Sequence, residues 1–415
     1  MRTLHLTTEL PYPAASGGAI RVNGIIEGLH KAGHDVTVIC FHEGDASEVP
    51  DYINIETVPL ITRTKRQRIN TLLFTQTADI ALRLYSDKFA TRLRELLIHQ
   101  QFDLVQFEGI EMVCYLPIVK QAQPDAKLCF DTFNAEFALQ DTIYRIDRSK
   151  IKRWPAALYS WLQVGRIKRF EGRMCRLADM VVAVSPEDAT SLQPFRPDQR
   201  IHIIPNGIHV GDFMDTSTSL LVGAQHAESL LSSPIEHNNA LVFTGKMDYR
   251  PNIDAMLWFT ESILPHIKRD MPDVNLYIVG QKPHARLEHL TTTDNVHITG
   301  WVDSVAPYLQ NATVYIAPLR MGSGTRLKLL GAMAAGCAIV ATTTACAGLL
   351  DEAKQAMIII DDEKQMAEKI VTLLNNPSQR GQMGKIAREK VEQYYDWSVL
   401  IPRLLDAYKE IGLGV

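Results

Sequence analysis

The chain has 415 residues, a formal net charge of −4 and a hydrophobic fraction of 46%. This length exceeds one ordinary core, so we expect two or three domains, and the absence of net basic charge argues against a general nucleic-acid-binding protein. The six cysteines are scattered without a CxxC pair, which argues against a zinc ribbon or a disulfide framework and predicts reduced, partly buried thiols.

The first half of the chain predicts a parallel α/β domain. A strand is expected at 2–8, a glycine loop at 9–18, a helix with one apolar face at 19–32 and an apolar strand at 36–41. Elements in this order form a βαβ unit, which requires a parallel sheet. Further short apolar runs predict strands at 102–107, 127–130, 180–184 and 201–204.

A stretch rich in Ser, Thr and Asn at 212–239 predicts a linker, and a second alternation of strands and helices follows it. Its strands are expected at 240–244, 275–279, 296–299, 314–317 and 338–341. Its helices are expected at 253–267, at 302–310, within 318–336 and over most of the remainder. The sequence therefore predicts two tandem doubly wound α/β domains, with a ligand beyond the carboxyl ends of the strands.

An uncharged run at 329–350 has the length of a membrane span. It is rich in Ala, Gly and Thr, and Gly336 interrupts it. We therefore interpret it as a helix, a turn and a buried strand. The N-terminus is too short and too polar for a signal peptide.

The clearest binding motif follows the strand expected at 314–317. Two glycines let the backbone approach a ligand closely, and the start of the next helix offers unpaired N–H groups and a partial positive charge. A hydroxyl and two cations complete an anion site suited to a diphosphate. The alternative is a plain loop ahead of a helix with solvated cations. The motif residues are Gly322, Ser323, Gly324, Thr325, Arg326 and Lys328.

The pair Gly17 and Gly18 makes a similar but weaker case, because two glycines before a helix can simply form a turn. Other phosphate and catalytic motifs are missing: the sequence contains no GxxxxGK[ST], no complete GxGxxG after the first strand and no GxSxG. It also contains neither HExxH nor DxD, so we predict no metal site.

At this point the chain resembles the group 1 glycosyltransferases of glycosyltransferase family 4, over nearly its whole length. In the first half the resemblance is carried by ELPYPAASGGAIRVNGIIEGLHKAGHDVTVI and FDTFNAEFALQ. In the second half it is carried by FTGKMDYRPNIDAMLWF and, most specifically, by GSGTRLKLLGAMAAGCAIVAT. The chain also resembles the subset linked with exopolysaccharide biosynthesis.

The resemblance implies the GT-B architecture, in which two Rossmann-like domains face a cleft. The implied parts are an acceptor-side domain at 1–206, a linker at 207–239, a nucleotide-sugar-binding domain at 240–395 and a C-terminal helix at 396–415 that crosses back onto the first domain.

The implied activity is retaining, metal-independent transfer of a sugar from a nucleotide-sugar donor to a glycan or lipid-linked acceptor in cell-surface polysaccharide synthesis. No cofactor is implied beyond the donor, which is a co-substrate. Arg326 and Lys328 would hold the diphosphate, Lys246 and Arg250 would add positive charge, and Gly18 would add a backbone N–H. The residues implied on the sugar and acceptor side are Asp131, Asn134 and Glu136.

Two positions depart from the family pattern. Gly331 stands where the family usually carries a glutamate that binds the donor ribose, and Phe133 stands where it commonly carries a histidine facing the sugar. A glycine inside a helix costs about 1 kcal/mol relative to alanine. Two hypotheses follow: an active transferase with an adapted site, or a catalytically impaired homologue that acts as a binding or regulatory partner in glycan assembly. An epimerase or phosphorylase on the same architecture is a third, which no motif favours.

Residues 150–169 place basic side chains around aromatic and apolar ones, as in helices that rest on anionic membrane surfaces. The alternative is a core-packed helix with solvated basic ends. The first interpretation predicts a cytoplasmic protein in peripheral contact with the inner face of an anionic membrane.

Overall fold

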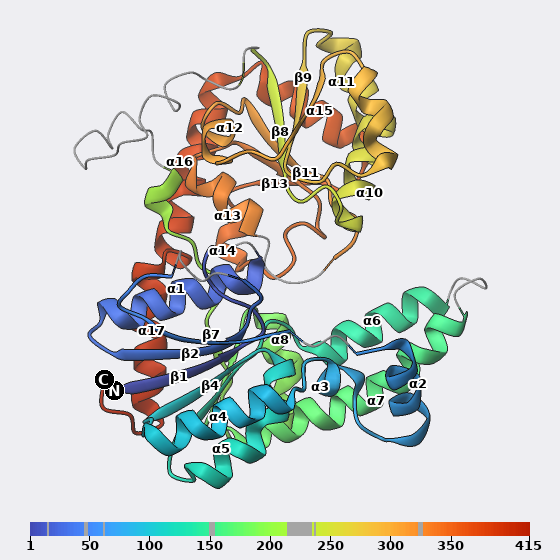
Figure 1. Cartoon of the computed structure of the whole chain (residues 1–415). Coiled ribbons are helices and arrows are strands. Elements are labelled where there is room, and N and C mark those ends of the chain that lie inside the picture. The colour runs from blue at the N-terminus through green and yellow to red at the C-terminus, as the bar shows by residue number, and fades with distance from the viewer. Residues whose placement is uncertain are drawn as a thin grey trace. The chain divides into compact units, whose positions relative to one another are not determined.

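The structure is a computed structural model, and it describes residues 1–14, 16–44, 49–60, 63–148, 154–213, 235, 238–322 and 327–415. The chain forms two compact units: Met1–Asn206 with Leu400–Val415, and Gly207–Val399. In each unit, helices cover both faces of a parallel sheet (Figure 1).

The sheet of the first unit has the strand order β3-β2-β1-β4-β5-β6-β7, and every neighbouring pair is parallel. The strands are β1 (Arg2–Thr7), β2 (Asp35–Phe41), β3 (Asn54–Val58), β4 (Leu104–Glu108), β5 (Lys127–Asp131), β6 (Met180–Ala183) and β7 (His202–Ile203). The helices are α1 (Gly17–Lys31), α2 (Lys65–Phe74), α3 (Asp79–Arg83), α4 (Asp87–His99), α5 (Leu116–Ala122), α6 (Glu136–Arg148), α7 (Trp154–Leu177), α8 (Pro186–Leu192) and most of α17 (Trp397–Glu410).

The sheet of the second unit has the order β10-β9-β8-β11-β12-β13 and is also parallel throughout. Its strands are β8 (Ala240–Thr244), β9 (Asn275–Val279), β10 (Val296–Gly300), β11 (Val314–Ala317), β12 (Ile339–Ala341) and β13 (Ile358–Ile359). Its helices are α10 (Arg250–Trp258), α11 (Leu264–Asp270), α12 (Ala306–Gln310), α13 (Leu327–Ala334), α14 (Asp351–Lys354), α15 (Glu363–Leu374) and α16 (Pro377–Tyr394).

The central strands of the second unit are buried along their whole length, as β8, β9 and β11 show. Strands that are covered on both faces have continuous apolar sequences, because neither side of the strand meets water. This is why short apolar runs predicted them correctly, and the predicted class of two doubly wound α/β domains is confirmed.

In both sheets the strand order reverses beside the first strand. The reversal lies between β1 and β4 in the first unit and between β8 and β11 in the second. Ligands of open α/β sheets bind beyond the carboxyl ends of the strands at such a point. These two places therefore position the candidate site residues of each unit.

Two predicted helices are wrong in extent, and proline explains both. The helix expected at 253–267 is interrupted by a wider turn at Phe259–Ile263, because Pro265 lacks an N–H group and cannot sit inside a regular helix. The helix expected at 302–310 begins only at Ala306, so that Pro307 lies in its first turn.

The uncharged run at 329–350 forms part of α13, a turn at Gly336 and the buried strand β12, as predicted. Within the described ranges, no helix is long and apolar enough to cross a membrane. All six cysteines are free thiols and five of them are buried. Most of the expected linker, at 214–234 and 236–237, lies outside the described residues.

The last helix, α17, packs mainly with the first unit. Residues 400–415 belong to that unit, and the Tyr408 hydroxyl donates a hydrogen bond to Gln106 Oε1 on β4 at 2.5 Å. A β-carbon at Gly28 of α1 would lie only 2.2 Å from Ile401 Cγ1, so this glycine permits the close packing of α1 on α17.

Candidate functional site

In the second unit, a pair of lysines lies where β8 ends and α13 begins. β8 ends at Thr244, and the Gly245 N–H donates to the Val279 carbonyl at 2.9 Å. Lys246 follows and is exposed, whereas Lys328 lies in the first turn of α13 and is half-buried. These two predicted cations therefore lie at the carboxyl edge of the sheet, at the reversal point.

Asn252 connects these two lysines, and the sequence analysis missed it. Lys328 Nζ donates to Asn252 Oδ1 at 2.7 Å, and Asn252 Nδ2 donates to the Lys246 carbonyl oxygen at 2.8 Å. The Asn252 side chain is buried, so its amide is held in one orientation. The Lys328 ammonium also lies 4.3 Å from the centre of the Phe243 ring, a cation–π distance. The Asn252 amide oxygen and the Phe243 ring therefore hold the Lys328 ammonium group in position.

The remaining predicted donor-side residues of this unit differ in what the structure describes. Arg250 is exposed and begins α10, four residues after Lys246. Gly322 has φ +121°, a conformation that favours glycine. The other members of the motif, Ser323, Gly324, Thr325 and Arg326, lie outside the described residues.

Gly331 packs against its own unit. A β-carbon at this position would lie 3.2 Å from Phe213 Cε1 and 3.6 Å from Leu309 Cδ1. The glutamate that the family usually carries here would therefore first have to displace the Phe213 ring. The side chains of Phe213 and Leu309 lie close to Gly331, and the sequence alone did not reveal this packing.

In the first unit, the start of α1 follows β1 at the reversal point. Ser16 caps the helix by accepting a hydrogen bond from the Ala19 N–H at 3.1 Å. Gly17 and Gly18 are the first two residues of α1, where backbone N–H groups have no acceptor within the helix. A β-carbon at Gly18 would lie 3.1 Å from Phe133 Cε2, and one at Gly109 would lie 3.4 Å from the same ring. The apolar Phe133 ring therefore packs against the first turn of α1.

Asp131, which was predicted on the sugar side, is buried. Its two oxygens accept hydrogen bonds from Arg21 Nε at 2.8 Å and Arg21 Nη2 at 2.7 Å. Arg21 is 1% exposed, and its Nη1 also donates to the carbonyl oxygens of Ile204 and Pro205 at 2.9 and 3.1 Å. Arg21 of α1 therefore connects two segments: β5 through Asp131, and the residues after β7 through their carbonyl oxygens. The only sequence signal for it was a charged residue among the apolar positions of α1.

Asn134 and Glu136 lie together at the start of α6. Asn134 Nδ2 donates to Glu136 Oε1 at 3.3 Å. Burial, together with the nearby charge of Glu111, raises the pKa of Glu136 to about 7, against the opposing effects of Asn134 and Arg83. A carboxyl group with this pKa can either accept or donate a hydrogen bond near neutral pH. Among the residues that the structure describes, no group of three or more His, Cys, Asp or Glu side chains is arranged to hold a metal ion.

Comparison with known proteins shows the family of the chain. The family model described as Glycosyltransferase Family 4 matches residues 15–211, and the one described as Glycosyl transferases group 1 matches residues 238–376. An uncharacterized 44.6 kDa protein in the cps region of Klebsiella pneumoniae is 21% identical over 401 residues, which cover 94% of this chain and 95% of that protein.

Solved structures share the fold over the full length. Sucrose-phosphate synthase from Thermosynechococcus elongatus superimposes with a TM-score of 0.71 at 16% identity, covering 99% of both chains. HepE of Anabaena, solved in complex with UDP, superimposes with a TM-score of 0.64 at 12% identity, covering 99% of this chain and 100% of that one. Since the two family models match complementary parts of the chain, the protein belongs to the glycosyltransferases, with a Family 4 part followed by a group 1 part in the GT-B architecture.

Proposed function

We propose that the protein is a retaining, metal-independent glycosyltransferase that moves a sugar from a nucleotide-sugar donor to a glycan or lipid-linked acceptor in cell-surface polysaccharide synthesis. The similarity to HepE, which binds UDP, supports a nucleoside diphosphate as the leaving group. The similarity to a protein of the Klebsiella cps region supports polysaccharide synthesis. Retention at the anomeric carbon follows from the resemblance of the sequence motifs to family 4.

The observation that carries the proposal is the fixed ammonium group of Lys328. Negative charge grows on the diphosphate oxygens as the bond to the sugar breaks. A cation that is already held in place stabilises this charge more in the transition state than in the ground state. Asn252 holds Lys328 without neutralising it. Lys246 and Arg250 add positive charge from the loop and helix that follow β8.

Within the first unit, the backbone N–H groups of Gly17 and Gly18 in the first turn of α1 are proposed to bind phosphate. N–H groups at helix starts and glycine loops bind phosphate groups. Ser323, Gly324, Thr325 and Arg326 remain predictions of this kind, made from their residue types and order. Asn134 and Glu136 are proposed to face the sugar or the acceptor.

We also propose that the protein works in the cytoplasm, in peripheral contact with the inner face of an anionic membrane. The side chains of Trp154, Leu158 and Trp161 are 62%, 59% and 57% exposed and follow one another at helical spacing on α7. Further along the same helix Lys168 and Arg169 are exposed. The single acidic residue of α7, Glu171, is buried, so the exposed surface of this helix is apolar and basic.

Substitution of Lys328 by methionine tests the donor site. The methionine keeps an apolar stem beside Phe243 and removes the ammonium group, so donor-dependent release of nucleoside diphosphate should fall by about a hundredfold. Lys385→Ala, at a 79% exposed side chain on α16, is the matched control and should not change the rate. Equal rates for Lys328→Met and the unaltered protein would contradict the proposal.

A further inference from the structure

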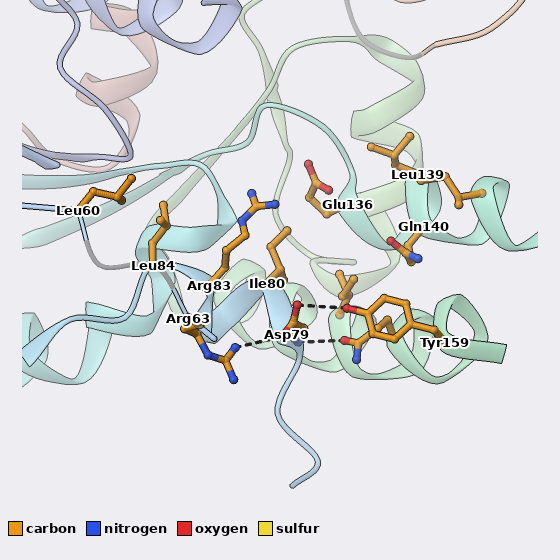
Figure 2. Close-up of a pocket in the computed structure, with 13 residues that line it drawn as sticks. Leu60, Arg63, Asp79, Ile80, Arg83, Leu84, Glu136, Leu139, Gln140 and Tyr159 are labelled. Atoms are coloured by element: carbon orange, nitrogen blue, oxygen red, sulfur yellow. Dashed lines mark hydrogen bonds and ion pairs between the residues drawn. The ribbon is translucent and has the colours of Figure 1, made fainter. Parts of the chain in front are cut away.

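A cavity of about 460 Å³ lies inside the first unit, between α3, α6, α7 and the segment that contains Leu60 (Figure 2). Its lining combines aliphatic side chains with charged and amide side chains. A cavity of this composition suits a ligand with one polar part and one apolar part. The polar residues used below are Arg83, Glu136 and Gln163.

Part of the cavity lining is a frame of hydrogen bonds around Asp79. Its carboxylate accepts hydrogen bonds from Arg63 Nη1 at 3.0 Å and from the Tyr159 hydroxyl at 3.1 Å. Its backbone N–H donates to Gln163 Oε1 at 2.9 Å. These contacts are drawn as dashed lines in Figure 2. The frame fixes the Gln163 amide, so the opposite end of that amide has a defined position.

Gln163 Nε2 is a buried donor that the described residues leave without an acceptor. The Gln163 side chain lines the cavity, and the residue is only 3% exposed. A buried N–H group without an acceptor is costly, and proteins rarely retain one without a reason. An oxygen atom of a ligand in the cavity would satisfy it.

Arg83 and Glu136 add polar groups from opposite walls. The Arg83 side chain is 59% exposed and forms an ion pair with Glu111. Figure 2 shows the Arg83 and Glu136 side chains projecting toward the same space, from α3 and α6 respectively. A guanidinium donates hydrogen bonds and a carboxylate accepts them, which together suit the hydroxyl groups of a sugar.

An aliphatic stripe leads away from this polar end. Leu139, Ile143 and Ile146 lie three, seven and ten positions after Glu136, on one side of α6. Leu139 and Ile143 line the cavity. Leu139 is half-buried, whereas Ile143 is 40% and Ile146 is 50% exposed, so the stripe runs from the cavity to the protein surface.

We propose that this cavity is the acceptor site and that its occupant is a glycolipid. The sugar head lies against Glu136, Arg83 and Gln163, and the aliphatic chain lies along Leu139 and Ile143. This inference rests on the proposed function, because it concerns the acceptor of that reaction. The exposed apolar and basic surface of the adjoining α7 gives a glycolipid in a membrane access to the cavity.

Alkyl glucosides with methyl, hexyl and octyl chains are suitable probes below their micelle concentrations. Their binding to the full-length protein would be followed by calorimetry. Each added methylene should raise the affinity about twofold, since a fully buried methylene raises it about fourfold and this stripe is partly open. Affinity that does not depend on chain length would overturn the proposal.

Two variants distinguish the binding of the alkyl chain from the binding of the sugar head. Ile143→Asp should remove the dependence on chain length, whereas Ile98→Asp, at a 72% exposed isoleucine on α4, is the matched control and should keep it. Gln163→Leu should weaken all probes by a similar factor of about ten. Thermal melting confirms that each variant is folded. An identical chain-length dependence in all three variants would show unspecific adsorption and would also overturn the proposal.

The unaltered protein distinguishes this proposal from the proposed function. Hydrolysis of a donor, in which water takes the sugar and nucleoside diphosphate is released, requires the donor site alone. If the protein releases it but binds no alkyl glucoside, the glycolipid site is wrong and the transferase stands. If it releases none with any donor, the proposed function itself fails. Concentration-dependent self-association that Ile143→Asp abolishes, without glucoside binding, would identify the stripe as a contact between two copies and overturn the glycolipid.

Discussion

At the scale of single residues, Asn252 connects the two lysines of the proposed donor site. It accepts a hydrogen bond from Lys328 and donates one to the carbonyl oxygen of Lys246. The Asn252 amide is uncharged, so it positions the Lys328 ammonium group without neutralising its charge. Asn252 thus acts as a positioning residue rather than as a catalytic one.

Asn252→Ala should lower kcat/KM for the donor by about ten- to a hundredfold, because a hydrogen bond to a charged group contributes roughly 1.5–3 kcal/mol. The measurement is steady-state release of nucleoside diphosphate at varied donor concentration. Asn311→Ala is the matched control, since the exposed Asn311 side chain, directly after α12, donates to the Pro307 carbonyl of that helix. Unchanged kinetics in Asn252→Ala would show that Lys328 needs no such support.

Gly331 yields a prediction about stability. Replacing a glycine inside a helix by alanine gains about 1 kcal/mol from helix propensity. At Gly331 the new β-carbon would lie 3.2 Å from the partly buried Phe213 ring, which must move slightly. Gly331→Ala should therefore stabilise the protein by less than Gly381→Ala, since a β-carbon at the exposed Gly381 of α16 meets nothing within 4 Å. Urea denaturation of both variants measures the difference; a larger gain at Gly331 would contradict this packing.

Sequence reasoning found the lysines but not their partner, and the reason is physical. Lys328 belongs to a local motif, a glycine loop before a helix, which is visible in consecutive residues. Asn252 lies 76 positions away from Lys328 and meets it only because β8 and β11 are neighbours in the sheet. The same limit applies to Asp131, whose burial against Arg21 depends on contacts across 110 positions.

At the scale of elements, one buried carboxyl group connects the helices α6 and α7. Glu171 of α7 accepts hydrogen bonds from the backbone N–H groups of Glu136 and Phe137, both at 3.0 Å. It thereby caps the first turn of α6 across the pair. Burial raises the pKa of Glu171 to about 8, although these two backbone groups oppose the shift.

The pH dependence of stability follows from that shift. Because the pKa of Glu171 in the folded protein lies above its ordinary value of 4.5, its contribution to stability is complete below about pH 4.5 and is lost as the pH rises through about 8. Glu171→Gln cannot ionise, so its stability should fall less than that of the unaltered protein between pH 5 and pH 8. Urea denaturation at both pH values tests this, with the half-exposed Glu95→Gln as control. Equal pH dependence in the two proteins would contradict the buried carboxyl.

Strand prediction succeeded where an apolar run marks the strand, including the edge strands β7 and β10, and failed for β3 and β13. The central strands of both sheets are apolar runs and were predicted, whereas the edge strands β3 and β13 were not. β3 is only partly buried and mixes polar with apolar residues, and β13 has only two residues. The break between α10 and α11 was missed because apolar periodicity continues through the turn that Pro265 imposes.

At the scale of the whole molecule, each unit brings a different chemistry to the carboxyl edge of its own sheet. The second unit presents lysines held by an amide and a glycine loop, and the first presents the start of α1 and the carboxyl group of Glu136. This division between the units matches the division between the two family models. The cavity beside α6 adds a proposed acceptor site, of which the sequence motifs indicated only Glu136.

The central claim is that this chain uses a nucleotide-sugar donor without a metal ion. The most direct measurement mixes the purified protein with UDP-, GDP-, ADP- and dTDP-sugars in the presence of EDTA. Calorimetry follows binding, and release of nucleoside diphosphate follows turnover. The account predicts saturable binding and release with one class of donor. Failure of every donor to bind, or release that occurs only after a divalent metal ion is restored, would contradict it.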